Sequence, residues 1–271
     1  MAKKHHAGLE HHQKEFVNLV SLNSRRHRKH EVFRDFCELA ALSISNAVDI
    51  QQRAVREARY MQIVAHYEQA EVARFPLMLA HVTMALEEGF HDCLGQLFMS
   101  LELGDHWKGQ FFTPYPISYL MARLSIDGAE STIQSKGFIT VNEPAAGAGA
   151  MLIAVANVLS DLGKNYQQCM HAIAQDIDET AVHMCYIQLS LLHVPGVVIQ
   201  GNSLMVEERN HWYTPSHILD GWDRKLLREN DFSVTDRTST GESMTTNPPT
   251  FQPQPAVKTI IPVLAQLDLF A

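Results

Sequence analysis

The sequence lacks any apolar run of the roughly 18 residues that a membrane-spanning helix needs. It also lacks an apolar segment behind its basic N-terminal residues, which disfavours a secretory signal. We therefore expect a cytoplasmic protein. With 46% hydrophobic and 19% charged residues among 271, the composition is typical of a globular chain with one large domain or two modest ones.

Cysteine is scarce, and no two of the four cysteines have the C-x-x-C spacing of a zinc knuckle or a dithiol redox site. We expect Cys37, Cys93, Cys169 and Cys185 to be free thiols in a reducing compartment. Histidine is frequent, yet no H-E-x-x-H pair occurs. His5-His6 and His11-His12 could bind a metal, but a solvated chain end is the favoured interpretation, so we predict no metal site.

An overall positive charge is also absent: the net charge is −8, which disfavours a protein whose whole surface is positively charged for binding nucleic acid. The N-terminal segment is locally basic, with Lys3, Lys4, Lys14 and the run from Arg25 to His30. Such a patch can neutralise phosphates and release counterions. A DNA contact and a solvated helix end both remain open.

Residues 31 to 103 carry apolar side chains at helical spacing and predict a helical N-terminal domain, residues 1–108. A second helix is expected from Phe75 to Leu101, with a break at Gly89. Thr113 suits an N-cap and Pro114 a first helical residue, so another helix should run to Leu124. The polar stretch from Ala129 to Lys136 is expected to be a loop.

From residue 137 the pattern becomes α/β. Strands are expected at 138–142, 172–176 and 197–200, with helices at 150–162 and 180–193 between them. Such β-α-β-α-β units have parallel strands and right-handed crossovers. This predicts a Rossmann-like cofactor-binding domain, residues 109–228, whose sheet is truncated because no convincing strands follow Gln200. Residues 229–271 are expected to be a flexible, disordered linker followed by a C-terminal docking peptide.

A glycine turn after the first strand suggests a cofactor site. Gly147 and Gly149 let backbone amides approach a ligand at a helix N-terminus. Asp176 ends the next strand, where nucleoside-binding folds place a carboxylate for ribose hydroxyls. NAD is disfavoured because the turn lacks the third glycine of G-x-G-x-x-G.

Four segments from Leu94 to Leu204 resemble adenine-N6 DNA methyltransferases, most closely the modification subunit of type I restriction systems. Residues 143–149, E-P-A-A-G-A-G, are similar to that family's D-P-A-C-G-S-G motif, and residues 109–114, G-Q-F-F-T-P, to its G-Q-F-Y-T-P segment. Residues 175–178 and 201–204 match its ribose-binding acid and its G-D-T-L segment. The resemblance implies S-adenosylmethionine, bound by Phe112, Thr113, Pro114, Glu143, Gly147, Gly149, Asp176 and Asn202. Glu143 and Asn202 each replace an aspartate of the family.

The resemblance also implies a catalytic N-P-P-[FY] loop after a fourth strand, which would hold the amine of an adenine flipped out of double-stranded DNA. Asn247, Pro248 and Pro249 are the candidates, but Thr250 follows them and no strand pattern precedes them. A proline pair in a linker is the favoured alternative. Trp212, Tyr213 and Trp222 could stack on a base, although packing over the sheet is favoured.

The C-terminal residues Q-L-D-L-F resemble the pentapeptide by which bacterial proteins dock on the DNA polymerase sliding clamp. Leu269 and Phe270 would fill an apolar pocket, next to Leu267, and the Gln266 amide would hydrogen-bond at its rim. A terminal strand or helix packing on its own domain is the alternative.

The leading hypothesis is an S-adenosylmethionine-dependent adenine-N6 DNA methyltransferase, with a specificity subunit as a further partner implied by the resemblance. The first alternative is a catalytically inactive cofactor-binding regulator or decoy, recruited to DNA through the sliding clamp. Methylation of a protein amide, which uses a similar loop, is a third.

Overall fold

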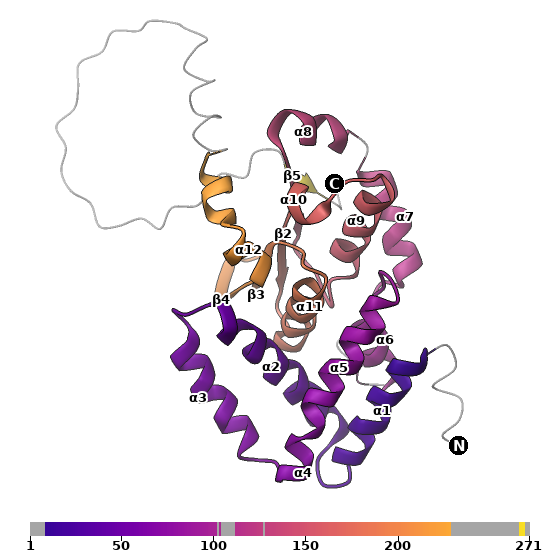
Figure 1. Ribbon diagram of the computed structural model, residues 1–271, viewed down its shortest axis with the longest axis vertical. Coiled ribbons are helices and arrows are strands. Elements are labelled where there is room, and N and C mark those ends of the chain that lie inside the picture. Colours follow the sequence, from indigo (N-terminus) through magenta and orange to yellow (C-terminus); the bar gives the residue numbers. More distant parts are fainter. Residues whose placement is uncertain (1–8, 102, 104–111, 127, 229–265, 269–271) are drawn as a thin grey trace, which may run out of the picture.

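The computed structural model describes residues 9–101, 103, 112–126, 128–228 and 266–268. Six described helices form the N-terminal part, shown in indigo to magenta in Figure 1. They are α1 (His11–Asn23), α2 (Lys29–Val48), α3 (Arg53–Val64), α4 (Gln69–Val72), α5 (Arg74–Glu87) and α6 (Cys93–Ser100). The predicted helical N-terminal part is thereby confirmed, while the domain boundaries stay predictions.

The bounds of α1 were not predicted from the sequence. His11 and His12 begin this helix instead of lying in an irregular chain end, although His11 is exposed. Its inward face buries Phe16, Val17 and Val20. Phe16 packs edge-on against Phe33 and Phe36 of α2, and α1 also lies along α5. Burial of this apolar stripe stabilises a helix whose sequence is otherwise polar.

The predicted break at Gly89 is confirmed. Gly89 has a φ of +151°, and the single helix expected from 75 to 101 is divided there into α5 and α6. The side chain of Asp92 caps α6 by accepting the N–H of Gly95 at 2.9 Å.

Two expectations about the next segment were wrong. The helix α7 (Tyr115–Ser125) has Pro114, not Thr113, as its N-cap, because Pro114 is extended and its carbonyl accepts the N–H of Ile117. Residues 129–136 form α8 (Ala129–Lys136) instead of a loop. Gly137, with a φ of +89°, ends α8 in the left-handed conformation that commonly terminates helices.

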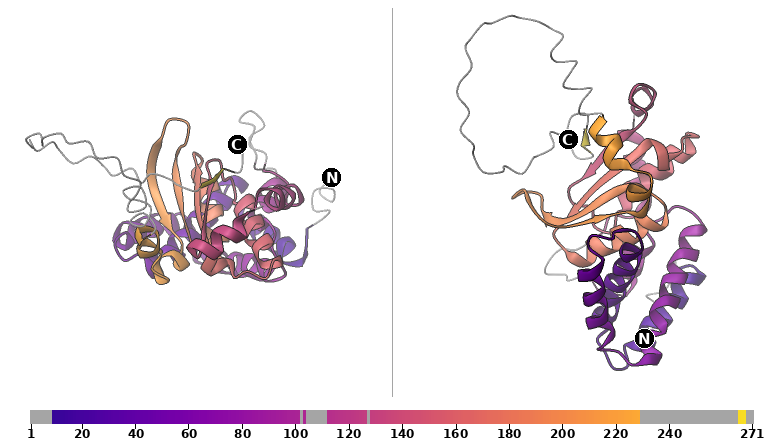
Figure 2. Two further views of the ribbon diagram at one scale, coloured as in Figure 1. Left: turned by 90° about the horizontal axis from the view of Figure 1, so that it is seen from above. Right: turned by 60° about the vertical axis from the view of Figure 1, so that its left-hand side comes forward.

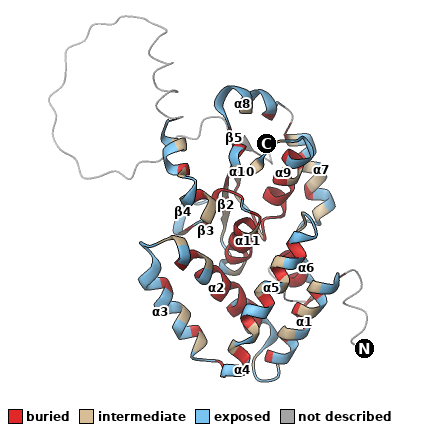
Figure 3. Cartoon of the chain, in the orientation of Figure 1, coloured by how far each residue is buried: buried red, intermediate tan, exposed pale blue. Residues whose placement is uncertain are grey.

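The parallel core of the sheet matches the prediction. The strands β1 (Ile139–Glu143), β2 (Met170–Asp176) and β3 (Gly196–Asn202) pair in parallel, with β2 in the centre. The crossovers contain α9 (Ala150–Asp161), α10 (Tyr166–Cys169) and α11 (Glu179–Leu191). The helix α11 packs on β2 and β3 on one side and on α2 on the other, and it is almost wholly buried (Figure 3). The sheet is therefore anchored to the helical part through α11.

Two further strands correct the expectation that none follows Gln200. The strand β4 (Glu207–Tyr213) pairs antiparallel with β3, and their hairpin reaches out from the body of the molecule (Figure 2). The strand β5 (Gln266–Asp268) pairs in parallel with residues 140–142 of β1. The strand order is β4-β3-β2-β1-β5, so β1 has a parallel neighbour on each side, β2 and β5. The strand order reverses direction at β1, which is the kind of position where open α/β sheets bind ligands.

The face of the sheet that bears His171 is covered by the segment around α12 (Pro215–Leu219). Trp222 is fully buried and its ring lies 5.1 Å from that of Phe138 and 5.2 Å from that of His171. Trp212 is buried against Tyr186, so packing, not base stacking, accounts for both tryptophans.

Some negative findings hold for the described residues. None of their helices is long and apolar enough to cross a membrane, and no three of their His, Cys, Asp or Glu side chains cluster to hold a metal. The four cysteines are buried free thiols.

Candidate cofactor site

The turn between β1 and α9 requires its glycines. Gly147 and Gly149 have φ values of +54° and +96°, in the region that favours glycine. A Cβ on Gly147 would lie 2.8 Å from the Phe112 ring, and one on Gly149 would lie 3.0 Å from the Cys185 sulfur. The turn thus lies tightly between Phe112 on one side and α11 on the other.

Asp176 lies opposite the glycine turn, at the adjacent strand end where the sequence predicted it. Its Oδ2 accepts the N–H of Gly147 at 2.8 Å, across the adjacent ends of β1 and β2. Its Oδ1 accepts the N–H of Asp178 at 2.9 Å. Burial raises the pKa of Asp176 from its usual value, although both N–H groups act in the opposite direction. A carboxylate and a glycine bend therefore lie together at the carboxyl edge of the sheet.

Glu143 lies beneath this edge and is only 1% exposed. Its Oε1 accepts the N–H of Ala145 at 3.1 Å, while Oε2 is buried with no hydrogen-bond partner in the described part of the chain. Burial, together with the nearby Asp176, raises the pKa of Glu143 to about 7. An unsatisfied buried oxygen at this position is an acceptor available to a ligand's donor.

The remaining predicted cofactor residues differ in their burial and in the contacts that they make. Phe112 packs edge-on against Phe98, at 5.2 Å between centroids, while Thr113 and Pro114 are exposed. Asn202 ends β3, and its side-chain oxygen accepts the backbone N–H groups of the next turn, at 3.1 and 3.2 Å. Asn202 thus shapes the β3–β4 hairpin, and no described contact joins it to Asp176.

Two residues beside the site were missed at the sequence level, and the capping role of a third, Asp178, was not predicted. Asp178 caps α11 by accepting the N–H of Ala181 at 3.0 Å, and an aspartate before a helical pattern is a signal that could have identified it. Gln188 and Asp92 are buried behind the turn and hydrogen-bonded to each other. Asp92 carries the same N-cap signal before α6, but no short stretch of sequence links it to the turn, and Gln188 within α11 carries no signal.

The predicted catalytic and docking residues are described only in part. Asn247, Pro248 and Pro249 lie outside the described residues, as do Leu269 and Phe270. Gln266 and Leu267 belong to β5. Since Asn247 precedes β5 in the sequence, β5 is not a strand that the N-P-P segment follows.

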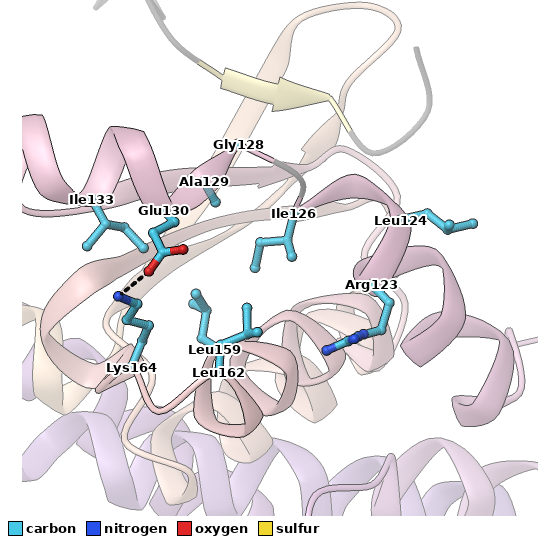
Figure 4. A pocket seen from close by; sticks show the side chains of 10 residues that line it. All are labelled: Arg123, Leu124, Ile126, Gly128, Ala129, Glu130, Ile133, Leu159, Leu162 and Lys164. Atoms are coloured by element: carbon cyan, nitrogen blue, oxygen red, sulfur yellow. Dashed lines mark ion pairs between the residues drawn. The ribbon is translucent and has the colours of Figure 1, made fainter.

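A pocket of about 380 Å³ lies elsewhere, between α7, α8 and the end of α9 (Figure 4). Ile126, Ile133 and Leu159 contribute apolar walls, and Lys164 forms an ion pair with Glu130 at 2.8 Å on its rim. None of the predicted cofactor residues lines it, so it is separate from the candidate site.

Comparison with known proteins shows a similarity to one family. Residues 102–218 match the model of the family described as N-6 DNA Methylase. The matched segment is similar to that family, and it contains the glycine turn and Asp176.

A curated relative is the Type I restriction enzyme MpnII methylase subunit of Mycoplasma pneumoniae, 30% identical over 118 residues. The match covers 42% of this chain and 20% of the relative, so the chain spans about a fifth of that protein's length. A solved structure from Listeria monocytogenes, described as a candidate class I S-adenosylmethionine-dependent methyltransferase, is 16% identical with a TM-score of 0.40. It covers 71% of this chain and 54% of the other.

Proposed function

We propose that the chain binds S-adenosylmethionine at the edge formed by the glycine turn and Asp176. The observation that carries this proposal is the 2.8 Å hydrogen bond from Gly147 to Asp176 within the matched segment. The Asp176 carboxylate suits the ribose hydroxyls, and the unpartnered Oε2 of Glu143 suits the donor of an ammonium group. The Phe112 ring lies against the turn, and Asn202 lies one strand away, where an adenine would reach.

The reaction we propose is transfer of a methyl group to N6 of adenine in double-stranded DNA. The cofactor supplies the activated methyl group, and the protein has to hold the adenine amine in place with acceptors. Asn247 and the prolines that follow it are the candidates for those acceptors in this chain, acting on a base flipped out of the duplex.

A partner chain is part of this proposal. The observation that supports it is the similarity to a type I methylase subunit. A second polypeptide of a restriction-modification system, such as a specificity subunit, would supply DNA recognition.

Calorimetric titration with S-adenosylmethionine tests the cofactor site. Asp176→Asn should weaken binding roughly 10- to 100-fold, because it removes a charged acceptor. Asp220→Asn changes an exposed aspartate outside the site and should bind like the wild type. A wild-type protein that does not bind S-adenosylmethionine would refute the proposal.

Transfer of labelled methyl groups to double-stranded DNA tests the reaction. Asn247→Ala should abolish transfer by the full chain, and methylation that survives this substitution would remove Asn247 from the mechanism. A third arm offers a peptide amide as acceptor, and methylation there in place of DNA would favour the protein substrate.

The alternative is an inactive cofactor-binding regulator or decoy, recruited to DNA by the sliding clamp. The observation that favours it is that the strand beside β1 comes after Asn247, so no described strand leads into the N-P-P segment. This alternative predicts cofactor binding without methyl transfer. It also predicts that the full chain retains the clamp in a pull-down, and that Leu269→Ala with Phe270→Ala abolishes retention.

A further inference from the structure

A single buried amide connects the glycine turn to the helical N-terminal part. Gln188, on α11, is 0% exposed and uses both ends of its side-chain amide. Its Nε2 donates to the carbonyl of Ala148 at 2.8 Å and to Oδ1 of Asp92 at 2.8 Å. Its Oε1 accepts the N–H of Leu94 at 3.0 Å. One side chain therefore links the turn, α11 and the start of α6.

Asp92 makes this connection rigid. It is buried, and the Oδ1 that receives the Gln188 amide also accepts the N–H of Gly95 at 2.9 Å. A Cβ on Gly95 would meet this carboxylate, so the start of α6 fits closely around it. A buried carboxylate is stable only when donors surround it, and Gln188 is one of its donors.

The bond to Ala148 controls the direction of a backbone N–H. The Ala148 carbonyl and the Gly149 N–H belong to one planar peptide group, so fixing the carbonyl also fixes the N–H. From the other side, Asp176 and the carbonyl of Gln175 accept the N–H groups of Gly147 and Ala146, at 2.8 and 2.9 Å. The turn is thus held on both sides, where glycines alone would leave it conformationally free.

We infer that Gln188 is a positioning residue that holds the glycine turn in its ligand-binding shape and couples it to the helical part through Asp92. For the cofactor, this inference rests on the proposed function. The order of the turn itself can be measured in the absence of any ligand.

Hydrogen exchange of the cofactor-free full chain, followed by mass spectrometry on peptides covering residues 144–151, measures that order. Gln188→Met has similar volume but no amide. It should increase exchange in the turn roughly 5- to 10-fold, as loss of the hydrogen bond to the Ala148 carbonyl implies. Gln188→Glu, when protonated, keeps the acceptor for Leu94 and one donor, so it provides a milder variant that preserves folding. It should give a smaller increase.

Two variants serve as controls. Asp92→Asn retains an Oδ1 for both Gln188 and Gly95, so exchange in the turn should stay at the wild-type rate. Val20→Ala removes buried volume on α1, far from the turn, and therefore lowers the overall stability of the protein. It should not speed exchange at residues 144–151.

Titration with S-adenosylmethionine gives the second readout, and Gln188→Met should weaken binding by the same roughly 5- to 10-fold while Val20→Ala should not. If both Gln188 variants fold and their turns exchange at the wild-type rate, the inference is overturned. A wild-type protein that ignores the cofactor would instead refute the proposed function, and the exchange data alone would then decide the role of Gln188.

Discussion

Replacing Glu143 with glutamine should change the pH dependence of stability in a direction fixed by the structure. Burial raises the pKa of this carboxyl from 4.5 to about 7, so the folded state holds the proton more tightly than the unfolded state. The resulting stability is fully present below pH 4.5 and is lost as the pH rises through 7. Over that range the loss amounts to about 3 kcal/mol.

The amide that Glu143→Gln introduces would carry no titrating proton, and its oxygen can still accept the N–H of Ala145. The difference in unfolding free energy between Glu143→Gln and wild type should therefore grow by about 3 kcal/mol from acid to mildly alkaline pH, or roughly 6 to 12 °C in Tm. The difference is the quantity to measure, because the buried histidines have lowered pKa values and make the wild type more stable as the pH rises.

Urea unfolding followed by circular dichroism, at several values between about pH 5 and about pH 8, measures this difference. Glu87→Gln, an exposed glutamate at the end of α5, is the matched control and should follow the wild type. A Glu143→Gln difference that is independent of pH would refute the reasoning. The same variant should bind S-adenosylmethionine more weakly if Glu143 accepts its ammonium group.

Three further outcomes are expected. Gly149→Ala should lose about 2 kcal/mol of unfolding free energy, because φ is +96° and the new Cβ meets Cys185; unchanged urea unfolding would contradict this. Arg56→Met leaves the carboxylate of Asp49 without its 2.7 Å partner and should cost about 3 kcal/mol, whereas the exposed Arg53→Met should cost little. Burial lowers the pKa of His171 from 6.5 to about 3, so protonation of this side chain opposes folding. His171→Gln should therefore reduce the loss of unfolding free energy on acidification, by about 2 kcal/mol near pH 5. An unaltered acid unfolding curve would argue against this.

The central β-α-β-α-β unit was predictable because its information is local. Apolar runs mark each strand, and the glycines at 147 and 149 mark the turn between the first strand and its helix. For the same reason the approach of Asp176 to Gly147 could be predicted, since parallel strands bring their carboxyl ends to one edge.

The missed elements are polar and owe their order to contacts distant in sequence. In β4 six of seven residues are polar or exposed, and the strand is held by Trp212, which packs on Tyr186 and under the guanidinium of Arg56. In α8 only Ala129 is buried, so periodicity gives no helical signal. Gln188 lies 96 residues from Asp92, and no short window of sequence contains both.

The short strand β5 links two equilibria. Gln266 and Leu267 hydrogen-bond along β1, and the same two residues begin the proposed clamp peptide, which cannot occupy both places at once. Whatever free energy the strand gains at the sheet is subtracted from the affinity of the peptide for its receptor. Substitutions in residues 140–142 that weaken the strand would therefore tighten docking without touching the receptor, and occupancy of the receptor would uncover the side of β1 beside the glycine turn.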